Sequence, residues 1–207
     1  MYGGVGWEID AQGVLAALKD VEGDVTVRMN SGGGDAFEGV AIKNVLRSHP
    51  GGVTVIVEGL AASAASVIAV GGADRLIMRP GSELMIHDAW TFADGNAADL
   101  EKTAADLERT SQSMAEIYAE KAGTDPEVMR QMMRDETWFS AQEAVDAGLA
   151  DAVEDGRVRA EPVVAAAGRG PRFAYAGRSH APTPKILKED NDVAFMSEVA
   201  KRLGMAD

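Results

Sequence analysis

The sequence predicts an α/β fold in which strands and helices alternate as βαβ units around a largely parallel sheet. Three observations lead to this prediction. Short runs of β-branched residues alternate with helical patterns over residues 1–155. Glycine-rich or small-residue segments stand where a strand would lead into a helix. One segment, Ala97–Ala122, keeps a helical periodicity over a length that indicates a single long helix.

The elements predicted in the first half of the chain follow from local signals. The strands are rich in β-branched residues, and Pro80-Gly81 marks the turn between the last two of them. One helix is expected to stop before His49-Pro50, because the residue before a proline disfavours helical backbone. In order, the expected elements are a helix over 14–18, a strand over 24–29, a helix over 36–47, a strand over 53–57, a helix over 63–70, and strands over 75–78 and 83–86.

The second half is predicted to be mostly helical. The segment Ala97–Ala122 has one face made of residues at steps of three and four. The residues on that face are Leu100, Ala104, Leu107, Ser111, Met114 and Tyr118. Asp125-Pro126 starts a further helix that reaches about residue 134. Ser140 and Glu143 have the spacing of a capping box for a last helix, which ends near Ala147.

The composition changes after Asp155, which predicts a boundary. Residues 156–194 are rich in glycine, proline and alanine and have few periodic apolar positions, which is typical of a linker or mobile arm. A short amphipathic helix is expected over residues 193–203. The predicted organisation is a domain over residues 1–155, a flexible linker or tail over 156–194, and a short helical segment over 195–207.

The composition also excludes several classes of function. The chain has 207 residues, no cysteine and a formal net charge of −13. Without cysteine there can be no thiol nucleophile, zinc–thiolate site or disulfide framework. A strongly acidic chain is not expected to bind nucleic acid, which attracts basic surfaces. The sequence has no apolar run long enough to span a membrane and no visible signal peptide, so we expect a cytoplasmic protein without a membrane partner.

Ser63 and His87 predict an enzymatic activity. Ser63 lies among alanines after a predicted strand, where small neighbours let a substrate approach its hydroxyl. His87 follows the apolar run 84–86, which would bring its imidazole to a sheet edge beside other strand ends. An imidazole there could take the proton of the serine hydroxyl. Each residue alone is also compatible with a structural role, Ser63 in a tightly packed helix and His87 as a packed histidine.

A glycine-rich loop and two acids complete the candidate site. Residues 30–34 read Asn-Ser-Gly-Gly-Gly at the end of a predicted strand, and successive glycines let backbone amides point at an anion. The loop could be an oxyanion hole, a phosphate site or a plain turn, although it lacks the lysine and hydroxyl residue of a P-loop. Asp135 and Glu136 precede a predicted strand and could orient the imidazole, or else form a solvated helix end.

These motifs, in this order, resemble those of the ClpP-like serine peptidases. That family has an Asn-Ser-Pro-Gly-Gly loop, a Gly-x-Ala-Ala-Ser segment, a Met-Ile-His segment and, after an acid, Ser-Ala-x-Glu-Ala and Gly-Leu-x-Asp. In this chain the corresponding segments are 30–34, 59–63, 85–87, 140–144 and 148–151. The match spans about residues 23–153. The resemblance implies a ClpP/crotonase-type spiral of βαβ units in which Ala97–Ala122 is a long helical arm.

The resemblance also implies roles for four residues of the site. Ser63 would be the catalytic nucleophile, and His87 would be the general base. The backbone amides of Gly34 and Ala64 would form the oxyanion hole. The resemblance implies neither a metal ion nor a cofactor.

Two positions depart from the family pattern. Gly32 replaces the usual proline of the glycine-rich loop, which loosens the loop without removing a needed amide. Glu136 stands four residues before Ser140, where the family has an aspartate. A glutamate can also orient a histidine, so Glu136 is the first choice for the third catalytic residue and its neighbour Asp135 is the second.

Within the family, the chain resembles the head maturation, or prohead, proteases of tailed phages and prophages. The segments that carry this likeness are 86–92 and 135–139, and segment 196–204 looks like the start of a fused scaffold region. The likeness implies an ATP-independent serine endopeptidase that cleaves phage procapsid or scaffold proteins and itself. It also implies a homo-oligomeric ring or double ring, located in the host cytoplasm or the assembling virion.

Other functions also fit the sequence. The chain could be a catalytically inactive capsid-assembly or scaffold protein. It could also be a crotonase-type acyl-CoA enzyme, which would use the same oxyanion hole but would not need Ser63 and His87 together. A peptidase with a serine–lysine dyad would usually carry a membrane anchor, and the sequence has none in view.

Overall fold

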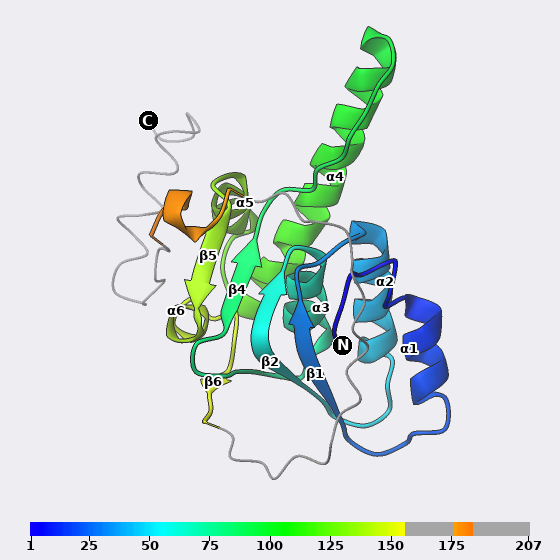
Figure 1. The fold of residues 1–207 in the computed structure, drawn as a ribbon, viewed down its shortest axis with the longest axis vertical. Coiled ribbons are helices and arrows are strands. Elements are labelled where there is room, and N and C mark those ends of the chain that lie inside the picture. The colour runs from blue at the N-terminus through cyan, green and yellow to red at the C-terminus, as the bar shows by residue number, and fades with distance from the viewer. Residues whose placement is uncertain (156–175, 184–207) are drawn as a thin grey trace.

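The strands of the described residues form one six-stranded sheet, with helices packed against it and a long helix that extends away from it (Figure 1). The computed structural model describes residues 1–155 and 176–183. In chain order the elements are α1 (Ala11–Leu18), β1 (Val25–Ser31), α2 (Ala36–Arg47), β2 (Val53–Ala62), α3 (Ala64–Gly72), β3 (Arg75–Met78), β4 (Glu83–Ile86), α4 (Ala97–Ala122), α5 (Pro126–Arg134), β5 (Thr137–Ser140), α6 (Ala141–Asp146), β6 (Ala152–Val153) and the 3₁₀ turn η1 (Arg178–His180). The predicted α/β fold with a long helical arm is confirmed.

β2 organises the sheet, because three other strands pair with it in parallel. β1 pairs with it from Val25↔Val53 onward, β3 pairs with its residues 54–57, and β4 pairs with its residues 60–62. β6 is parallel to β3, whereas β5 is antiparallel to β4. The sheet is therefore largely parallel, as the alternation of strands and helices predicted. Parallel pairing brings the C-terminal ends of β1, β2 and β4 to the same edge of the sheet.

The main core lies between the sheet and helices α2 to α5. α3 is buried over nearly its whole length, and its small and branched apolar residues let it lie close to its neighbours. α2 approaches α3 through Gly39, where an added Cβ would come within 3.0 Å of the Ala64 Cβ. A second, smaller cluster on the opposite face of the sheet contains Ala62, Met85 and Trp138, which are neighbours across β2, β4 and β5.

α4 is buried only in its C-terminal half. Its buried residues are Ser111, Met114, Ala115, Tyr118 and Ala119. The N-terminal half extends beyond the rest of the molecule (Figure 1) and leaves Leu100 44% exposed. The apolar face predicted from the sequence is therefore covered by the protein's own core in one half and uncovered in the other.

The predicted element boundaries hold where a strong local signal marks them and shift elsewhere. The bounds of α2, β3, β4 and α4 are those predicted. α1 begins at Ala11, earlier than the predicted residue 14, because the Asp10 side chain accepts a hydrogen bond from the Gly13 N–H and caps the helix there. β2 continues to Ala62, past its predicted end at residue 57, because β4 pairs with this extension.

Residues 176–183 fall within the predicted linker but are docked against β5 and α6. The Arg178 guanidinium donates to the Trp138 carbonyl (2.8 Å) and to the Glu143 carboxylate (2.8 Å), and Ala181 packs on the smaller cluster. The other residues of the predicted linker, and the helix predicted over 193–203, lie outside the described residues. In the part of the chain that the structure describes, no helix is long and apolar enough to cross a membrane.

Candidate active site

Ser63 stands at a sharp turn between β2 and α3. The turn precedes the helix, so Ser63 is not its first residue as predicted. Its backbone angles are φ 56° and ψ −127°, a region that a non-glycine residue occupies only when its surroundings enforce it. They do so here, since the Ser63 N–H donates to the Met85 carbonyl (3.0 Å) and the Ser63 carbonyl accepts from the Ser66 N–H (2.9 Å). A serine on a strained strand-to-helix turn is the geometry that exposes a nucleophile in many hydrolases.

His87 lies directly after β4, and its imidazole contacts the Ser63 hydroxyl. The His87 Nε2 and the Ser63 Oγ are 2.8 Å apart. This contact exists because β4 pairs with the end of β2, which places the residues that follow both strands beside each other. Both side chains are largely buried, with exposures of 9% for Ser63 and 7% for His87. Hydrogen-bond reach between a serine and a histidine is what proton transfer from the hydroxyl requires.

The surroundings of His87 favour its neutral form. Burial lowers the pKa of the imidazole below its ordinary value, and the nearby carboxylates of Glu136 and Asp88 oppose that shift. A neutral imidazole has an unprotonated ring nitrogen that can accept the serine proton. Activity that depends on this nitrogen would fall as the pH drops through the pKa of His87, because protonation then fills the acceptor.

The glycine-rich loop after β1 lies against the Ser63 turn. Gly33 has φ 95°, and a Cβ there would come within 2.5 Å of the Ala62 carbonyl oxygen and 2.7 Å of the Ser63 Cβ. Gly34 has φ 148°, and a Cβ there would come within 2.1 Å of the Val5 carbonyl oxygen. Side chains at these positions would push the loop away from the serine, so the close approach requires glycine.

The N-terminal segment orients the amide of Gly34. Val5 forms a parallel bridge with Gly34, in which the Val5 N–H donates to the Gly33 carbonyl (2.9 Å) and the Asp35 N–H donates to the Val5 carbonyl (3.0 Å). The Gly34 N–H therefore points away from Val5. On the other side, Ala64 opens α3, and an N–H in the first turn of a helix has no acceptor within that helix.

Glu136 and His87 act on each other through their charges. Glu136 has φ 48°, and its carboxylate accepts hydrogen bonds from the Trp138 indole and from the backbone N–H groups of Ala176 and Gly177, each at 3.0 Å. Burial alone would raise the pKa of Glu136, but these hydrogen bonds and the attraction of His87 outweigh it and hold the pKa below its ordinary value. Glu136 is therefore ionised at neutral pH.

Asp135 points elsewhere. It is exposed at the C-terminal end of α5, and its carboxylate accepts a hydrogen bond from the Gln131 side chain (3.2 Å). Glu136 is among the groups that shift the pKa of His87. Of the residues predicted for the site, Ser63 and His87 are in hydrogen-bond contact, Glu136 acts on the imidazole through its charge, and the Asp135 carboxylate contacts Gln131.

Residues 7–157 match the model of the Clp protease family. The chain belongs to the Clp protease family. The ATP-dependent Clp protease proteolytic subunit of Ligilactobacillus salivarius is 33% identical over 146 residues, which cover 70% of this chain and 74% of that protein. The ATP-dependent Clp protease proteolytic subunit 2 of Corynebacterium glutamicum is 32% identical over 144 residues, which cover 69% of this chain and 72% of that protein.

Solved structures agree on the fold. A mutant of ClpP1 from Listeria monocytogenes superposes with a TM-score of 0.67 over 76% of this chain and 90% of that chain, at 24% sequence identity. The curated relatives extend beyond the region that matches, since the alignments span between 60% and 74% of their lengths. The family match thus covers Ser63, His87 and Glu136, whereas residues 176–183 lie beyond the matched range.

Two features of the site in this Clp protease-family chain were not predicted from the sequence. The first is the pair of amides from Ala176 and Gly177 on the Glu136 carboxylate. The second is an ion pair between Asp88, next to His87, and Arg130 of α5. No local pattern could have revealed either contact, because both join segments that are far apart in the sequence.

Proposed function

We propose that this chain is a serine endopeptidase in which Ser63 is the nucleophile and His87 is the general base. The 2.8 Å contact between the Ser63 Oγ and the His87 Nε2, at a strained turn, is the observation that carries the proposal. Glu136 orients the imidazole and stabilises its cation, and the amides of Gly34 and Ala64 bind the oxyanion. These last roles are supported by the ionised state of Glu136 and by the close approach of the glycine-rich loop to Ser63.

The proposed reaction follows the general chemistry of acyl transfer to a serine. The Ser63 Oγ attacks the carbonyl carbon of a peptide bond while its proton moves to the His87 Nε2. The carbonyl oxygen becomes an oxyanion, which the two backbone amides stabilise. The intermediate collapses when His87 gives the proton to the leaving nitrogen, and an acyl-enzyme remains. Water then attacks the ester with His87 again as the base, which releases the acid and restores Ser63.

We further propose that peptide hydrolysis here is independent of ATP and that the substrates are phage procapsid or scaffold proteins. The relatives are named as proteolytic subunits of ATP-dependent proteases, but the groups assembled around Ser63 need only water as the second reactant. The substrate class rests on the sequence likeness of segments 86–92 and 135–139 to head maturation proteases. Cleavage of a purified procapsid protein without nucleotide tests both parts.

A fluorophosphonate probe distinguishes a serine hydrolase from the alternatives. The probe reacts with an activated serine, so a peptidase should show modified Ser63 in a digest analysed by mass spectrometry. A catalytically inactive assembly protein would not react. A crotonase-type enzyme would also remain unmodified at Ser63, because its chemistry does not use that hydroxyl. Unlabelled Ser63 in folded, assembled protein would contradict the peptidase proposal.

We expect the chain to assemble into a ring, or a double ring, through the uncovered half of α4. Leu100 and Leu107 continue the buried face of the helix into the part that extends from the body (Figure 1). Apolar surface of this kind favours association. Light scattering should therefore give a mass well above that of one chain, and Leu107→Glu should lower it, because the variant would bury an unpaired charge.

The matched control for this prediction is Ala105→Glu. Ala105 is exposed on the other side of the same helix, so its substitution adds the same charge away from the apolar face. We expect the assembled mass of this variant to stay as in the wild type. A monomeric wild type at working concentration, or equal dissociation of both variants, would rule out assembly through this face.

Slow self-cleavage is expected between residues 161 and 177. This stretch is rich in small residues, and an extended segment can pair with a strand edge in a peptidase cleft. Its last described residues, Ala176 and Gly177, lie against Glu136. Intact-mass measurements over time should show a shortened chain in the wild type and none in Ser63→Ala. Equal trimming in both proteins would indicate contaminating proteases and leave the peptidase proposal standing.

A further inference from the structure

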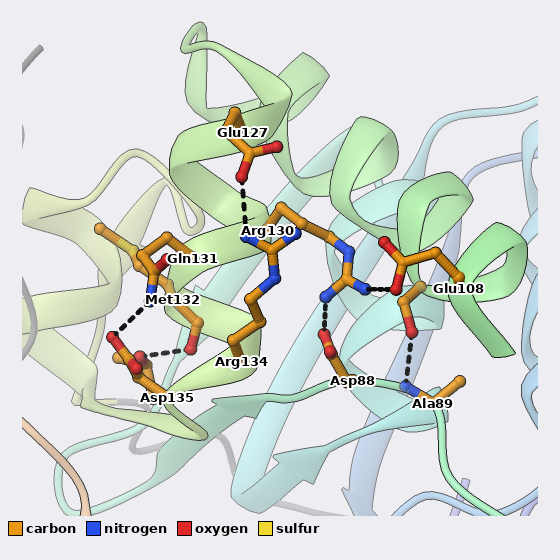
Figure 2. A network of polar contacts seen from close by, with 11 residues as sticks. Asp88, Ala89, Glu108, Glu127, Arg130, Gln131, Met132, Arg134 and Asp135 are labelled. Carbon is orange, nitrogen blue, oxygen red and sulfur yellow. Dashed lines mark hydrogen bonds and ion pairs between the residues drawn. The ribbon is translucent and has the colours of Figure 1, made fainter. Parts of the chain in front are cut away.

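Arg130 is a buried cation in α5 that touches none of the residues proposed to react. The residue is 1% exposed, and burial of a guanidinium is costly unless carboxylates compensate its charge. Two carboxylates do so (Figure 2). One Nη group pairs with Asp88, and the other pairs with the Glu108 Oε2 at 2.7 Å. The two ion pairs hold the Arg130 guanidinium between α4 and the turn after β4.

The arrangement that Arg130 holds is the turn directly after His87. Asp88 follows His87 in the chain, and its N–H donates to the Met133 carbonyl of α5 (3.3 Å). The next residue, Ala89, donates its N–H to the buried Ser111 hydroxyl of α4 (3.0 Å). Figure 2 shows Asp88 paired with the Arg130 guanidinium and, beside it, the contact of Ala89. The segment that leaves β4 is therefore tied to both α4 and α5 within two residues of the imidazole.

The ion pair between Arg130 and Asp88 also changes the electric field at the His87 imidazole. Two charged groups that act on His87 are Glu136, just before β5, and Asp88 on its own turn. Arg130 from α5 is paired with Asp88 and with Glu108 from α4. A cation paired with Asp88 offsets the field of that carboxylate at the imidazole. Arg130 pairs with Asp88 and Glu108, so its charge offsets the field of Asp88 at the imidazole more than the field of Glu136.

We propose that Arg130 is a positioning residue for His87, because through Asp88 it holds the turn after β4 and screens the Asp88 charge from the imidazole. This role rests on the proposed function of His87 as the general base. Arg130 itself does not touch the reacting atoms. It acts on the protonation and the placement of a residue that does.

Arg130→Met is the variant that tests this role, with Arg134→Met as its matched control. Arg134 lies one turn further along α5, and its guanidinium pairs with Glu127 at 2.8 Å instead of with Asp88. The Asp88 and Glu108 side chains are 34% and 64% exposed, so water can solvate both once the arginine is gone, and we expect Arg130→Met to fold. Circular dichroism and the assembled mass check the fold of each variant.

The first measurement is the pKa of His87 by histidine side-chain NMR, which needs no turnover. Loss of the cation should raise this pKa by about 0.5–1 unit in Arg130→Met, because the Asp88 carboxylate then stabilises the imidazolium unopposed. Asp88→Asn should lower it, because the variant removes that carboxylate. The double variant should lie near the wild type. Arg134→Met should change nothing.

The second measurement is the pH dependence of peptide hydrolysis. In Arg130→Met the acid limb should move to higher pH by the same amount, and kcat should fall at least tenfold with KM little changed, because His87 is less well placed. Arg130→Lys, which keeps the charge, should keep the wild-type pH limb.

The opposite directions expected for Arg130→Met and Asp88→Asn make the proposal testable even if one variant is unstable. A His87 pKa that is unchanged in Asp88→Asn, or that moves equally in Arg130→Met and Arg134→Met, would overturn it. Failure of this proposal can be distinguished from failure of the proposed function. If the chain is not a serine peptidase, the fluorophosphonate probe leaves Ser63 unlabelled, and the pKa of His87 can still be measured by NMR in every variant.

Discussion

Ser63→Ala should abolish peptidase activity while the protein keeps its fold and assembly. The substitution removes the oxygen that attacks the substrate, and loss of a serine nucleophile typically lowers kcat by roughly 10⁴–10⁶-fold. It removes little packing, because Ser63 has alanine neighbours on both sides and its Oγ contacts His87. Alanine also has to adopt the positive φ at this turn, as serine does, so the backbone requirement is unchanged. Hydrolysis of a fluorogenic peptide measures the effect.

Ser66→Ala is the control for this loss. Ser66 lies one turn into α3, is fully buried, and its hydroxyl bonds to the Ser63 carbonyl (2.7 Å) and to the Tyr118 hydroxyl (2.8 Å). The variant should lose about 1 kcal/mol of stability and keep turnover within roughly tenfold of the wild type. Near-normal turnover in Ser63→Ala would remove Ser63 from the mechanism. A collapse of activity in Ser66→Ala without unfolding would point to the wrong serine.

Glu136→Gln should lower kcat by about 10²–10⁴-fold, and Asp135→Asn should leave it nearly unchanged. A neutral amide can no longer stabilise the imidazolium that forms as Ser63 attacks. It also offers a single acceptor oxygen to the three N–H donors that now bind the carboxylate. Asp135 has its contact with Gln131 on the surface, so its charge is not expected to matter for the reaction.

Glu136→Asp separates the charge from the length of the side chain. The Clp-like pattern has an aspartate at this position, so this variant should keep more activity than Glu136→Gln if the carboxylate itself is what His87 needs. The kinetic measurement is kcat for a soluble peptide across pH. If Asp135→Asn is the damaging change instead, the assignment of the acid is wrong by one residue.

Much of the fold could be predicted because its signals are local. The three- and four-residue steps of one apolar face predicted α4, and the structure adds a capping box at Asn96 and a left-handed Gly123 at its ends. The Ser140–Glu143 spacing predicted the cap of α6. The predicted start of α1 was too late, because Asp10 was not recognised as its N-cap. The predicted end of β2 was too early, because its last residues are not β-branched and form a strand through pairing with β4.

For the candidate site, the sequence by itself determined which residues would lie together. The order of the glycine-rich loop, Ser63 and His87 along alternating strands and helices already implied that they meet, since parallel strands end at one edge of a sheet. The glycine-rich loop at 30–34 could be singled out because successive glycines let backbone amides point at an anion.

Only the tertiary structure decided which contacts Glu136 and Asp135 make. The two acids are neighbours in sequence, and no local pattern distinguishes them. Their backbones diverge at the positive φ of Glu136, which turns one carboxylate inward and leaves the other at the surface. The charges that shift the pKa of His87 lie on Asp88, after β4, and on Glu136, before β5, and donors that hold Glu136 come from residues 176–177. Electrostatic fields depend on distance in space, so they follow from packing and cannot be read from spacing in the chain.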